Sequence, residues 1–454
     1  MKLDSLYALS PIDGRYRSEV STLARFFSEA ALMRYRIQVE VRYLMAFSDQ
    51  SNIPEVRRLT ATERKLLQSL YEDFSPRATE RIKTIEQTTK HDVKAVEYYI
   101  KEKLKRTSLR KVLEFVHFGL TSEDVNNLAY SLMLRDGVQQ VYIPLVNQLI
   151  KELKQRARRY KNVAILSLTH GQPATPTTLG KELAVFALRL QRQLIVLRSI
   201  KLLGKFGGAT GNWAALAVAY PKVNWLAFSR RFVERLGLEF NPITTQIESH
   251  DRLAETYQAI SRLNVIVRNL DQDMWFYISR GIFGQANIAG EVGSSAMPHK
   301  INPIWFENSE GNCGIANALL HHLAEKLPLS RLQRDLTDST VLRNQGQAMA
   351  YSVLATQSTL KGLARVQANK IQATAELNEH WEVLAEAIQT VMRRLGKSTP
   401  YEQLKSLTRG QQLDKVTLHC FIDSLDLPET DKVALKKLTP ATYTGLSSKI
   451  PQLI

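Results

Sequence analysis

Long stretches of the chain repeat apolar residues every three or four positions, which is the spacing of an α-helix with one buried face. The clearest stretch runs from Asp251 to Arg280 and contains no proline. Most of its charged residues fall outside the apolar stripe, and at about 1.5 Å per residue the helix would be about 45 Å long. Such a helix needs other long helices to pack against. The stripe consists of Leu253, Tyr257, Ile260, Leu263, Val267, Leu270, Met274 and Tyr277.

Three further segments have the same period, namely residues 139–160, 179–203 and 345–370. No convincing series of alternating strands lies between them. Turn-rich segments separate the predicted helices, and loops at helix ends often carry binding and catalytic groups. These segments cover residues 168–178, 204–212, 289–303 and 327–343. We therefore predict an all-α fold built on an elongated helical bundle.

The chain has 454 residues, more than one hydrophobic core usually organises. We predict an N-terminal helical domain over residues 1–111, a central long-helix bundle over 112–364 and a C-terminal helical domain over 365–454. The first boundary follows a basic run. Beyond the second boundary the predicted helices are shorter and are interrupted by Gly396, Pro400 and Gly410.

The composition is that of a globular protein, with 44% hydrophobic and 23% charged residues. No apolar stretch is long enough to span a bilayer, and the N-terminal residues lack the apolar region of a signal peptide. Cys313 and Cys420 lie far apart and form no CxxC pair, so neither a disulfide framework nor a zinc knuckle is indicated. We predict a soluble protein of the cytoplasm, without membrane association.

The net charge of +17 fits either nucleic-acid binding or attraction of a polyanionic small substrate. The densest basic runs, residues 101–111 and 154–161, contain few aromatic residues and no nucleic-acid-binding signature. We interpret them as solvated faces and predict no nucleic-acid partner. A basic nucleic-acid binder stays an alternative, and strongly salt-dependent retention of DNA or RNA would reveal it.

The segment GEVGSSAMPHKINP, residues 290–303, lies between two strongly helical stretches. Its glycines and prolines cannot continue a helix, so we predict a loop in which Gly290 and Gly293 give freedom of movement. A plain polar connector would not require this combination of side chains. Groups of the kind that hold carboxylates come from Ser294, Ser295, Lys300 and Asn302.

Two other segments carry candidate chemistry. His170, in THGQPATPTTLGKE, is a candidate acid or base because an imidazole titrates near neutral pH. Thr121 and Ser122, in HFGLTSEDVNNL, can cap the following helix, whose first amides attract anions. Capping alone explains Thr121 equally well. Two further segments, residues 90–97 and 330–344, add charged groups, and the arginines of the latter suit a phosphate or carboxylate.

Competing motifs are weak. LGKST, residues 395–399, resembles the end of a phosphate loop, but Val391 stands where the leading glycine should be. We interpret Gly396 as the end of a helix. His321 and His322 are adjacent, so they cannot share a helix face as metal ligands, and no HExxH motif is present. We expect neither a metal nor another cofactor.

Together these segments resemble the adenylosuccinate lyase family of the fumarase/aspartase superfamily. GSSAMPHKINP resembles the superfamily marker and occurs with TSEDVNN and THGQPATP in the expected order. SPIDGRY, TTKHDVKAVEY and RDLTDSTVLRN resemble the adenylosuccinate lyase branch in particular. The resemblance covers nearly the whole chain. It implies a fumarase/aspartase-like helical fold and a homotetramer that associates through the central bundles and builds each active site from three subunits.

The resemblance also implies a reaction, the β-elimination of fumarate from adenylosuccinate to give AMP and from the succinyl-carboxamide ribotide of purine synthesis (SAICAR to AICAR). By the family's pattern Ser294 is the general base, His170 the acid that protonates the departing nitrogen, and Glu307 the carboxylate that orients the histidine. The substrate-binding residues that it implies are Arg15, Tyr16, Lys90, His91, Asp92, His117, Thr121, Ser122, Gln246, Ser295, Lys300, Ile301, Asn302, Asn308, Arg334, Ser339, Thr340, Val341, Leu342 and Arg343.

Another lyase of the superfamily, such as argininosuccinate lyase or fumarase, is the nearest alternative. Substrates of those enzymes lack a ribotide phosphate, whereas residues 10–16 and 334–343 here offer more anion-binding groups than two carboxylates need. A non-catalytic structural protein with the same fold is a further alternative. The presence of His170, Ser294, Lys300 and Asn302 argues against it.

Overall fold

The computed structural model describes residues 5–288, 290, 296–297, 299–408 and 413–454. The chain forms two compact units, each assembled from segments that are far apart in sequence. Unit 1 comprises Met1–Leu145, Gln193–Asn264 and Asn312–Leu354, and unit 2 comprises Val146–Arg192, Val265–Gly311 and Ala355–Ile454. Unit boundaries fall inside long helices, and the three domains proposed from the sequence stay a prediction.

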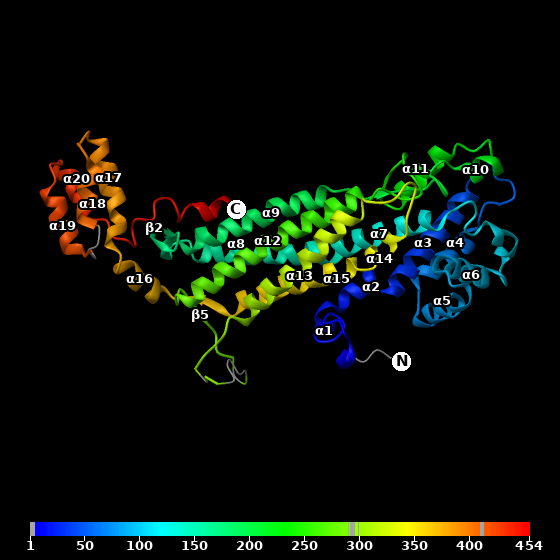
Figure 1. Ribbon diagram of the computed structural model, residues 1–454, viewed down its shortest axis with the longest axis horizontal. Helices are drawn as coiled ribbons and strands as arrows, with labels where there is room; N and C mark the ends of the chain where they lie inside the picture. The colour runs from blue at the N-terminus through cyan, green and yellow to red at the C-terminus, as the bar shows by residue number, and fades with distance from the viewer. Residues whose placement is uncertain (1–4, 289, 291–295, 298, 409–412) are drawn as a thin grey trace. The chain divides into compact units, whose positions relative to one another are not determined.

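The long helices expected from the apolar period are present (Figure 1). In the longest of them Tyr257, Leu263 and Val267 are fully buried, as the apolar stripe predicted. Two predicted helix ends are wrong, because the chain enters short strands at residues 203 and 366. The long helices are α8 (Ile143–Arg159), α9 (Leu179–Ser199), α12 (Asp251–Ser279), α13 (Ile304–Lys326) and α15 (Gln345–Ala364). None of the helices in the described part of the chain is long and apolar enough to cross a bilayer.

Unit 1 is helical, and α3 packs against both α6 and α7 (Figure 1). Its N-terminal helices are α1 (Arg17–Val20), α2 (Ala24–Phe27), α3 (Glu29–Ser48), α4 (Ala61–Glu72), α5 (Pro76–Thr89), α6 (Asp92–Leu104) and α7 (Ser122–Gly137). A π-helical turn (Val138–Tyr142) leads from α7 into α8. The remaining elements are α10 (Ala214–Ala219), α11 (Trp225–Arg235), α14 (Thr337–Leu342) and the parallel pair β3 (Leu203–Gly204) and β4 (Glu239–Phe240).

An aromatic cluster joins α3 to the segment that precedes α7. Ring centroids are 5.6 Å apart for Phe47 and Phe118 and 5.2 Å apart for Tyr43 and Phe206. The Tyr43 hydroxyl donates a hydrogen bond to the carbonyl oxygen of Phe118 at 2.7 Å. The backbone beside His117 is thereby fixed against α3.

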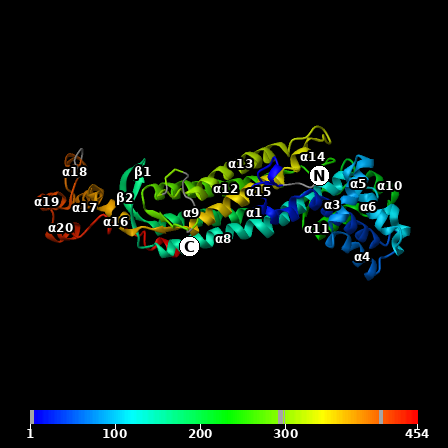
Figure 2. The same ribbon diagram turned by 90° about the horizontal axis from the view of Figure 1, so that it is seen from below.

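Unit 2 contains an antiparallel hairpin of β1 (Ala164–Thr169) and β2 (Gln172–Thr178), along which α16 (Lys370–Asn378) packs (Figure 2). The prediction of turns throughout residues 168–178 is wrong, since most of this segment is strand. Pro173 and Pro176 are tolerated because a two-stranded ribbon leaves one side of each strand without a ladder partner. A second antiparallel pair joins β5 (Phe283–Gln285) to β6 (Val366–Ala368).

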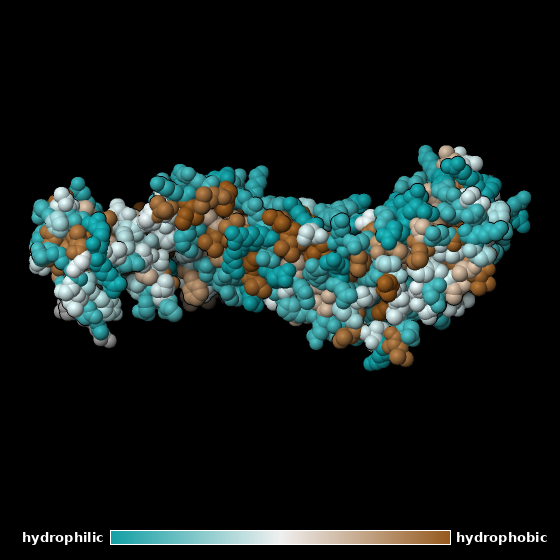
Figure 3. Space-filling model, turned by 90° about the horizontal axis from the view of Figure 1, so that it is seen from above, coloured by the Kyte–Doolittle hydropathy of each residue, from teal (hydrophilic) through white to brown (hydrophobic). Residues whose placement is uncertain are grey.

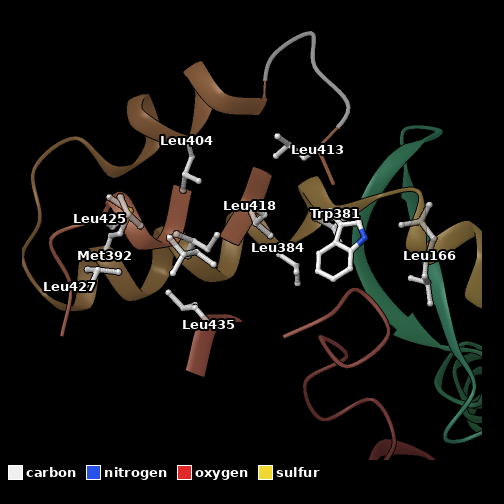
Figure 4. Packing of buried hydrophobic residues seen from close by; sticks show 14 residues of the cluster. Leu166, Trp381, Leu384, Met392, Leu404, Leu413, Leu418, Leu425, Leu427 and Leu435 are labelled. Atoms are coloured by element: carbon white, nitrogen blue, oxygen red, sulfur yellow. The ribbon is translucent and has the colours of Figure 1, made fainter. Parts of the chain in front are cut away.

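The C-terminal helices enclose a separate hydrophobic core within unit 2. Leu384, Leu418 and Leu435 point into this core, and Trp381 lies between it and Leu166 of β1 (Figure 4). The hairpin is therefore anchored by apolar packing. Gly396 ends α17 with a φ of +68°, which confirms the interpretation as a helix end. The helices are α17 (Ala385–Arg394), α18 (Pro400–Thr408), α19 (Lys415–Ser424) and α20 (Glu429–Lys436).

Candidate active site

The junction of α5 and α6 brings three of the predicted residues together. Lys90 ends α5 in a left-handed conformation, with a φ of 54°, and His91 then caps α6. The His91 Nδ1 accepts a hydrogen bond from the Lys94 N–H at 3.2 Å. A neutral ring that accepts at Nδ1 carries its proton on Nε2, and this atom lies 3.5 Å from Ser122 Oγ.

Asp92 is shared by two arginines. Its Oδ2 lies 2.8 Å from Arg36 Nη2 and 2.9 Å from Arg343 Nη2, and the Val93 N–H donates to its Oδ1 at 2.8 Å. Burial disfavours the charged form, but the Arg36 charge and these hydrogen bonds outweigh it and lower the pKa of Asp92 to about 2. Arg343 also contacts Glu29 Oε2 at 3.1 Å while 41% of its side chain stays exposed, so it can meet a ligand from solvent.

His117 lies against the buried carboxylate of α3. Its Nδ1 is 2.5 Å from Oε1 of Glu40, whose side chain is fully buried. Burial lowers the pKa of His117, but the Glu40 charge and hydrogen bond raise it by more, so the pKa lies above its ordinary value. The positive φ of His117, 62°, is followed by Gly119 with a φ of 68°, where a Cβ atom would lie 2.3 Å from the Leu216 side chain. Both the backbone conformation and the lack of space at position 119 therefore require a glycine in this turn.

Thr121 caps α7, as the sequence predicted. Its N–H donates to Asp124 Oδ2 at 2.9 Å, in a capping box. Asp124 also pairs with Lys205 Nζ at 2.8 Å, and both side chains are fully buried. The Gly207 N–H donates to Asp124 Oδ1 at 2.9 Å, which ties the loop after β3 to the start of α7. Contact of Thr121 with a substrate stays a prediction.

Arg334 and Gln246, both predicted to bind substrate, lie together. Arg334 Nη1 donates to Gln246 Oε1 at 3.2 Å, and Gln246 Nε2 donates to the carbonyl oxygen of Ala209 at 3.0 Å. Arg334 Nη2 lies 3.2 Å from Oε2 of Glu123, a buried residue of α7. Burial raises the pKa of Glu123 to about 7 although Arg334 and His250 oppose the shift.

The other predicted residues of unit 1 occupy two short segments. Arg15 is exposed, and its guanidinium carbon lies 5.8 Å from the centre of the Tyr16 ring. The α14 helix carries Ser339, Thr340, Val341 and Leu342. Leu342 is only 1% exposed, so its side chain belongs to the core, whereas the Thr340 side chain faces solvent.

His170 stands at the tip of the β1–β2 hairpin in unit 2. Thr169 pairs with Gln172, so His170 and Gly171 form a two-residue turn, with φ values of 54° and 74°. Two positive φ values are typical of a type I′ turn, whose twist matches that of a hairpin. His170 is exposed. A cavity of about 540 Å³ beside the hairpin is lined by β1, β2, α9 and α12, with Lys181 and Arg280 among its charged groups.

Ser294 and Ser295, like Gly293, lie outside the described residues. The Lys300 N–H donates to the carbonyl oxygen of Met297 at 3.0 Å, and the Lys300 side chain is exposed. The carbonyl oxygen of Ile301 accepts a hydrogen bond from Gln285 Nε2 at 2.7 Å. Asn302 is half-buried just before α13 begins.

Glu307 and Asn308 lie in the first turns of α13. Glu307 Oε1 accepts a hydrogen bond from Trp275 Nε1 at 3.2 Å, and Asn308 Oδ1 accepts one from Ser358 Oγ at 2.8 Å. Among the residues described in unit 2, no ion pair joins Glu307 to His170. The orienting role of Glu307 stays a prediction.

Five ionisable residues that lie beside the predicted site residues were not identified from the sequence. They are Arg36, Glu40, Glu123, His250 and Asp338. Arg36 and Glu40 lie four positions apart on the buried face of α3, and each is 1% exposed. Charged residues at that spacing on an apolar face were a readable signal. Glu123, His250 and Asp338 each offer one metal-ligand atom within 4.8 Å of the others. The absence of a metal from the reaction stays a prediction.

The helical fold, in which a histidine stands at a hairpin tip and Arg334 pairs with Glu123 at the start of α7, is the fold of a lyase of the fumarase/aspartase type. Residues 14–317 match the lyase family, and residues 330–444 match the adenylosuccinate lyase C-terminal family. The chain is 52% identical over 446 residues to the adenylosuccinate lyase of Escherichia coli, with 98% of each chain covered. It is 50% identical over 451 residues to that of Haemophilus influenzae, with 99% of each covered. The chain belongs to the adenylosuccinate lyase family of enzymes.

Solved structures show the same fold at low identity. A fumarate lyase from Mesorhizobium sp. BNC1 superimposes with a TM-score of 0.77 at 17% identity, covering 95% of this chain and 97% of that one. The 3-carboxy-cis,cis-muconate lactonizing enzyme from Pseudomonas putida gives a TM-score of 0.72 at 20% identity, with 95% and 96% covered. The predicted fumarase/aspartase-like helical fold is confirmed.

Proposed function

We propose that the protein cleaves adenylosuccinate to AMP and fumarate, and cleaves the succinyl-carboxamide ribotide in the same way. The full-length identity of about half the residues to lyases named for the first substrate carries the proposal. Arg334 and Arg343 support it, since each guanidinium is held by a carboxylate while part of its surface stays open. Anion-binding groups of this kind suit a ribotide phosphate in addition to two carboxylates.

In the proposed reaction, Ser294 Oγ takes a proton from the succinyl carbon, the carbon–nitrogen bond breaks, and His170 protonates the departing nitrogen. Charge builds up on the neighbouring carboxylate, and Lys300 and Asn302 would stabilise it. A serine hydroxyl is a weak base near neutral pH, so donors must surround its anion. On the binding side, Ser122 and His117 would hold the anionic substrate.

We further propose a homotetramer in which active sites are shared between chains. His170 and Lys300 are exposed in the single chain, as expected for groups that complete a site on another subunit. Large apolar side chains are exposed on the long helices, and Figure 3 shows hydrophobic residues gathered in patches along one face of them. Burial of such patches between chains is favourable. The residues include Val185 and Ile195 of α9, Val265 and Phe276 of α12, and Ile315 of α13.

A location in the cytoplasm completes the proposal. Cys313 and Cys420 are free cysteines, the first buried and the second exposed, which suits a reducing compartment. Fractionation of the native host, with this protein detected by antibody, tests the location. Sedimentation of the purified protein tests the tetramer, since a monomer at micromolar concentration would contradict it.

The activity is tested by mixing purified protein with adenylosuccinate and following fumarate release by ultraviolet absorbance. Release of fumarate and AMP in equal amounts is the expected result. Argininosuccinate and malate serve as control substrates, because turnover of either in preference to adenylosuccinate would favour another lyase of the superfamily. No turnover of any of these by folded protein would favour a structural role.

A further inference from the structure

A buried cluster of three ionisable side chains lies beside Arg334 in unit 1. The side chains of Glu123, His250 and Asp338 are 2%, 1% and 5% exposed. They come from α7, from the turn before α12 and from α14. Within the described residues, Glu123 Oε1, Asp338 Oδ2 and both His250 ring nitrogens have no hydrogen-bond partner. Polar atoms in this state are rare inside proteins, so the arrangement calls for a reason.

Arg334 is the cation that faces this group. Its Nη2 lies 3.2 Å from Glu123 Oε2 and 3.7 Å from Asp338 Oδ1, while its Nη1 donates to Gln246 Oε1 at 3.2 Å. Two terminal nitrogens are therefore held from the protein side, which fixes the plane of a rigid guanidinium. Because this cation already lies beside two of the three potential metal ligands, the arrangement suits a held guanidinium better than a metal ion.

The His250 ring lies between the carboxylates of Asp338 and Glu248. Its Nε2 lies 3.9 Å from Asp338 Oδ2, and its Nδ1 lies 3.9 Å from Glu248 Oε2. Glu248 is held independently, because Asn241 Nδ2 donates to its Oε1 at 2.9 Å. The φ of His250 is 64°, a conformation that residues with a side chain seldom adopt and that is found at functional positions. The backbone thus places the ring between two carboxylates at the expense of strain.

We infer that Glu123 and Asp338 are positioning residues that hold the Arg334 guanidinium in the orientation in which it binds the phosphate of the substrate. This inference rests on the proposed function for the identity of the anion. The carboxylates act only through Arg334 and do not touch the substrate. Loss of a group that orients a binding residue weakens metal sites about 10–100-fold, and we expect a loss near the lower end for a phosphate.

A double-mutant cycle on the AMP dissociation constant, measured by calorimetry, tests the inference. Glu123→Ala should raise this constant about tenfold in the wild-type background and leave it unchanged in the Arg334→Ala background, because the effect passes through Arg334. Glu123→Gln keeps an oxygen facing Arg334 and should lose less affinity than Glu123→Ala. Saturating turnover should fall less than kcat/KM, since the phosphate is remote from the breaking bond.

Glu63→Ala is the matched control. Glu63 is a buried glutamate of unit 1 that contacts Arg57 and Ser108 and none of the site residues, so AMP affinity should not change. Glu123→Gln replaces Glu123→Ala in the cycle where the alanine variant does not fold. Equal losses in the wild-type and Arg334→Ala backgrounds would overturn the inference, as would unchanged affinity on loss of Glu123.

The inference and the proposed function fail in different ways. Wild-type protein that binds AMP but releases no fumarate from adenylosuccinate would refute the proposed reaction. The double-mutant cycle on the AMP dissociation constant could still be measured and would still test the inference. Wild-type protein that binds neither AMP nor inorganic phosphate would overturn the inference, because Arg334 would then have no anion to hold.

Discussion

Glu123→Gln should make the protein more heat-stable at alkaline pH, although Glu123 supports Arg334. Burial raises the pKa of this carboxyl from 4.5 to about 7, so the folded chain keeps a proton that the unfolded chain has already lost. The stabilisation that this proton gives is complete below the unfolded pKa and is lost as the pH rises through about 7. Above that, the wild-type protein must fold around a buried charge.

The size of the effect follows from the pKa difference. At about 1.4 kcal/mol per pKa unit, a rise of this size corresponds to roughly 3 kcal/mol of unfolding free energy that a neutral side chain at position 123 would recover. At roughly 2 °C per kcal/mol for a large cooperative unit, the melting temperature should rise by about 6 °C at pH 8.5. At pH 5.5, one pH unit above the unfolded pKa, roughly 1.4 kcal/mol of this stabilisation is already lost, so the melting temperature should rise by only about 3 °C.

Thermal melts of wild type and Glu123→Gln at pH 5.5, 7.0 and 8.5 test this reasoning. Glu63→Gln is the control of opposite sign. Hydrogen bonding to Arg57 holds the pKa of Glu63 well below its usual range against the effect of burial, and Ser108 and Thr60 contribute further hydrogen bonds. Its charge therefore stabilises at every pH tested, and Glu63→Gln should melt earlier throughout. A shift for Glu123→Gln that is equal at pH 5.5 and 8.5, or negative at pH 8.5, would refute the argument.

Four further outcomes are expected. His170→Ala and Ser294→Ala should each cut turnover about 10²–10⁴-fold, and mixing the two inactive proteins should restore activity if sites are shared; no recovery after verified subunit exchange would count against sharing. Arg343→Ala should raise the AMP dissociation constant roughly 10–100-fold in titrations and affect fumarate much less. Gly180→Ala should lower the melting temperature, because a Cβ atom there would lie 2.3 Å from a backbone oxygen of α8. By NMR, His117 should titrate above its ordinary pKa, and its stabilising contribution should be complete below about pH 6.5 and fade as the pH rises through the folded value.

The long helices were predictable because their signal is local. The apolar period from Asp251 to Arg280 marks one buried face, and α12 ends within one residue of that segment. The β1–β2 hairpin was not predictable by the same means. Its second strand, rich in threonine and proline, shows no alternation, and it is a strand only because β1 pairs with it. Strand pairing depends on a partner that a window of sequence does not contain.

The residues of the candidate site show the same difference between local sequence signals and contacts with distant residues. Motifs predicted Thr121 as a helix cap, which the structure confirms, and Arg334 as an anion-binding residue, which stays a prediction. Most of the groups that hold the arginines were missed because they are distant from the arginines in sequence, although Asp338 is only four positions from Arg334. Arg36 and Asn126 are 90 positions apart, and Gln246 and Arg334 are 88 positions apart. Gln246 was predicted from the resemblance to a family. Arg36 was not predicted, either from that resemblance or from a residue pattern.

The start of α7 explains how such distant groups come to be spaced correctly. An α-helix turns about 100° per residue, so neighbouring residues at its start point in different directions. The partners of Ser122, Glu123, Asp124 and Asn126 are His91, Arg334, Lys205 and Arg36. One rigid helical turn thus fixes the distances among these groups from separate segments of unit 1, and we propose that His91 and Arg334 among them bind the anionic substrate. Binding energy from a remote phosphate assists at the breaking bond only when the two ends of a substrate are held in a fixed relation, and a single helix start meets that requirement more rigidly than separate loops would.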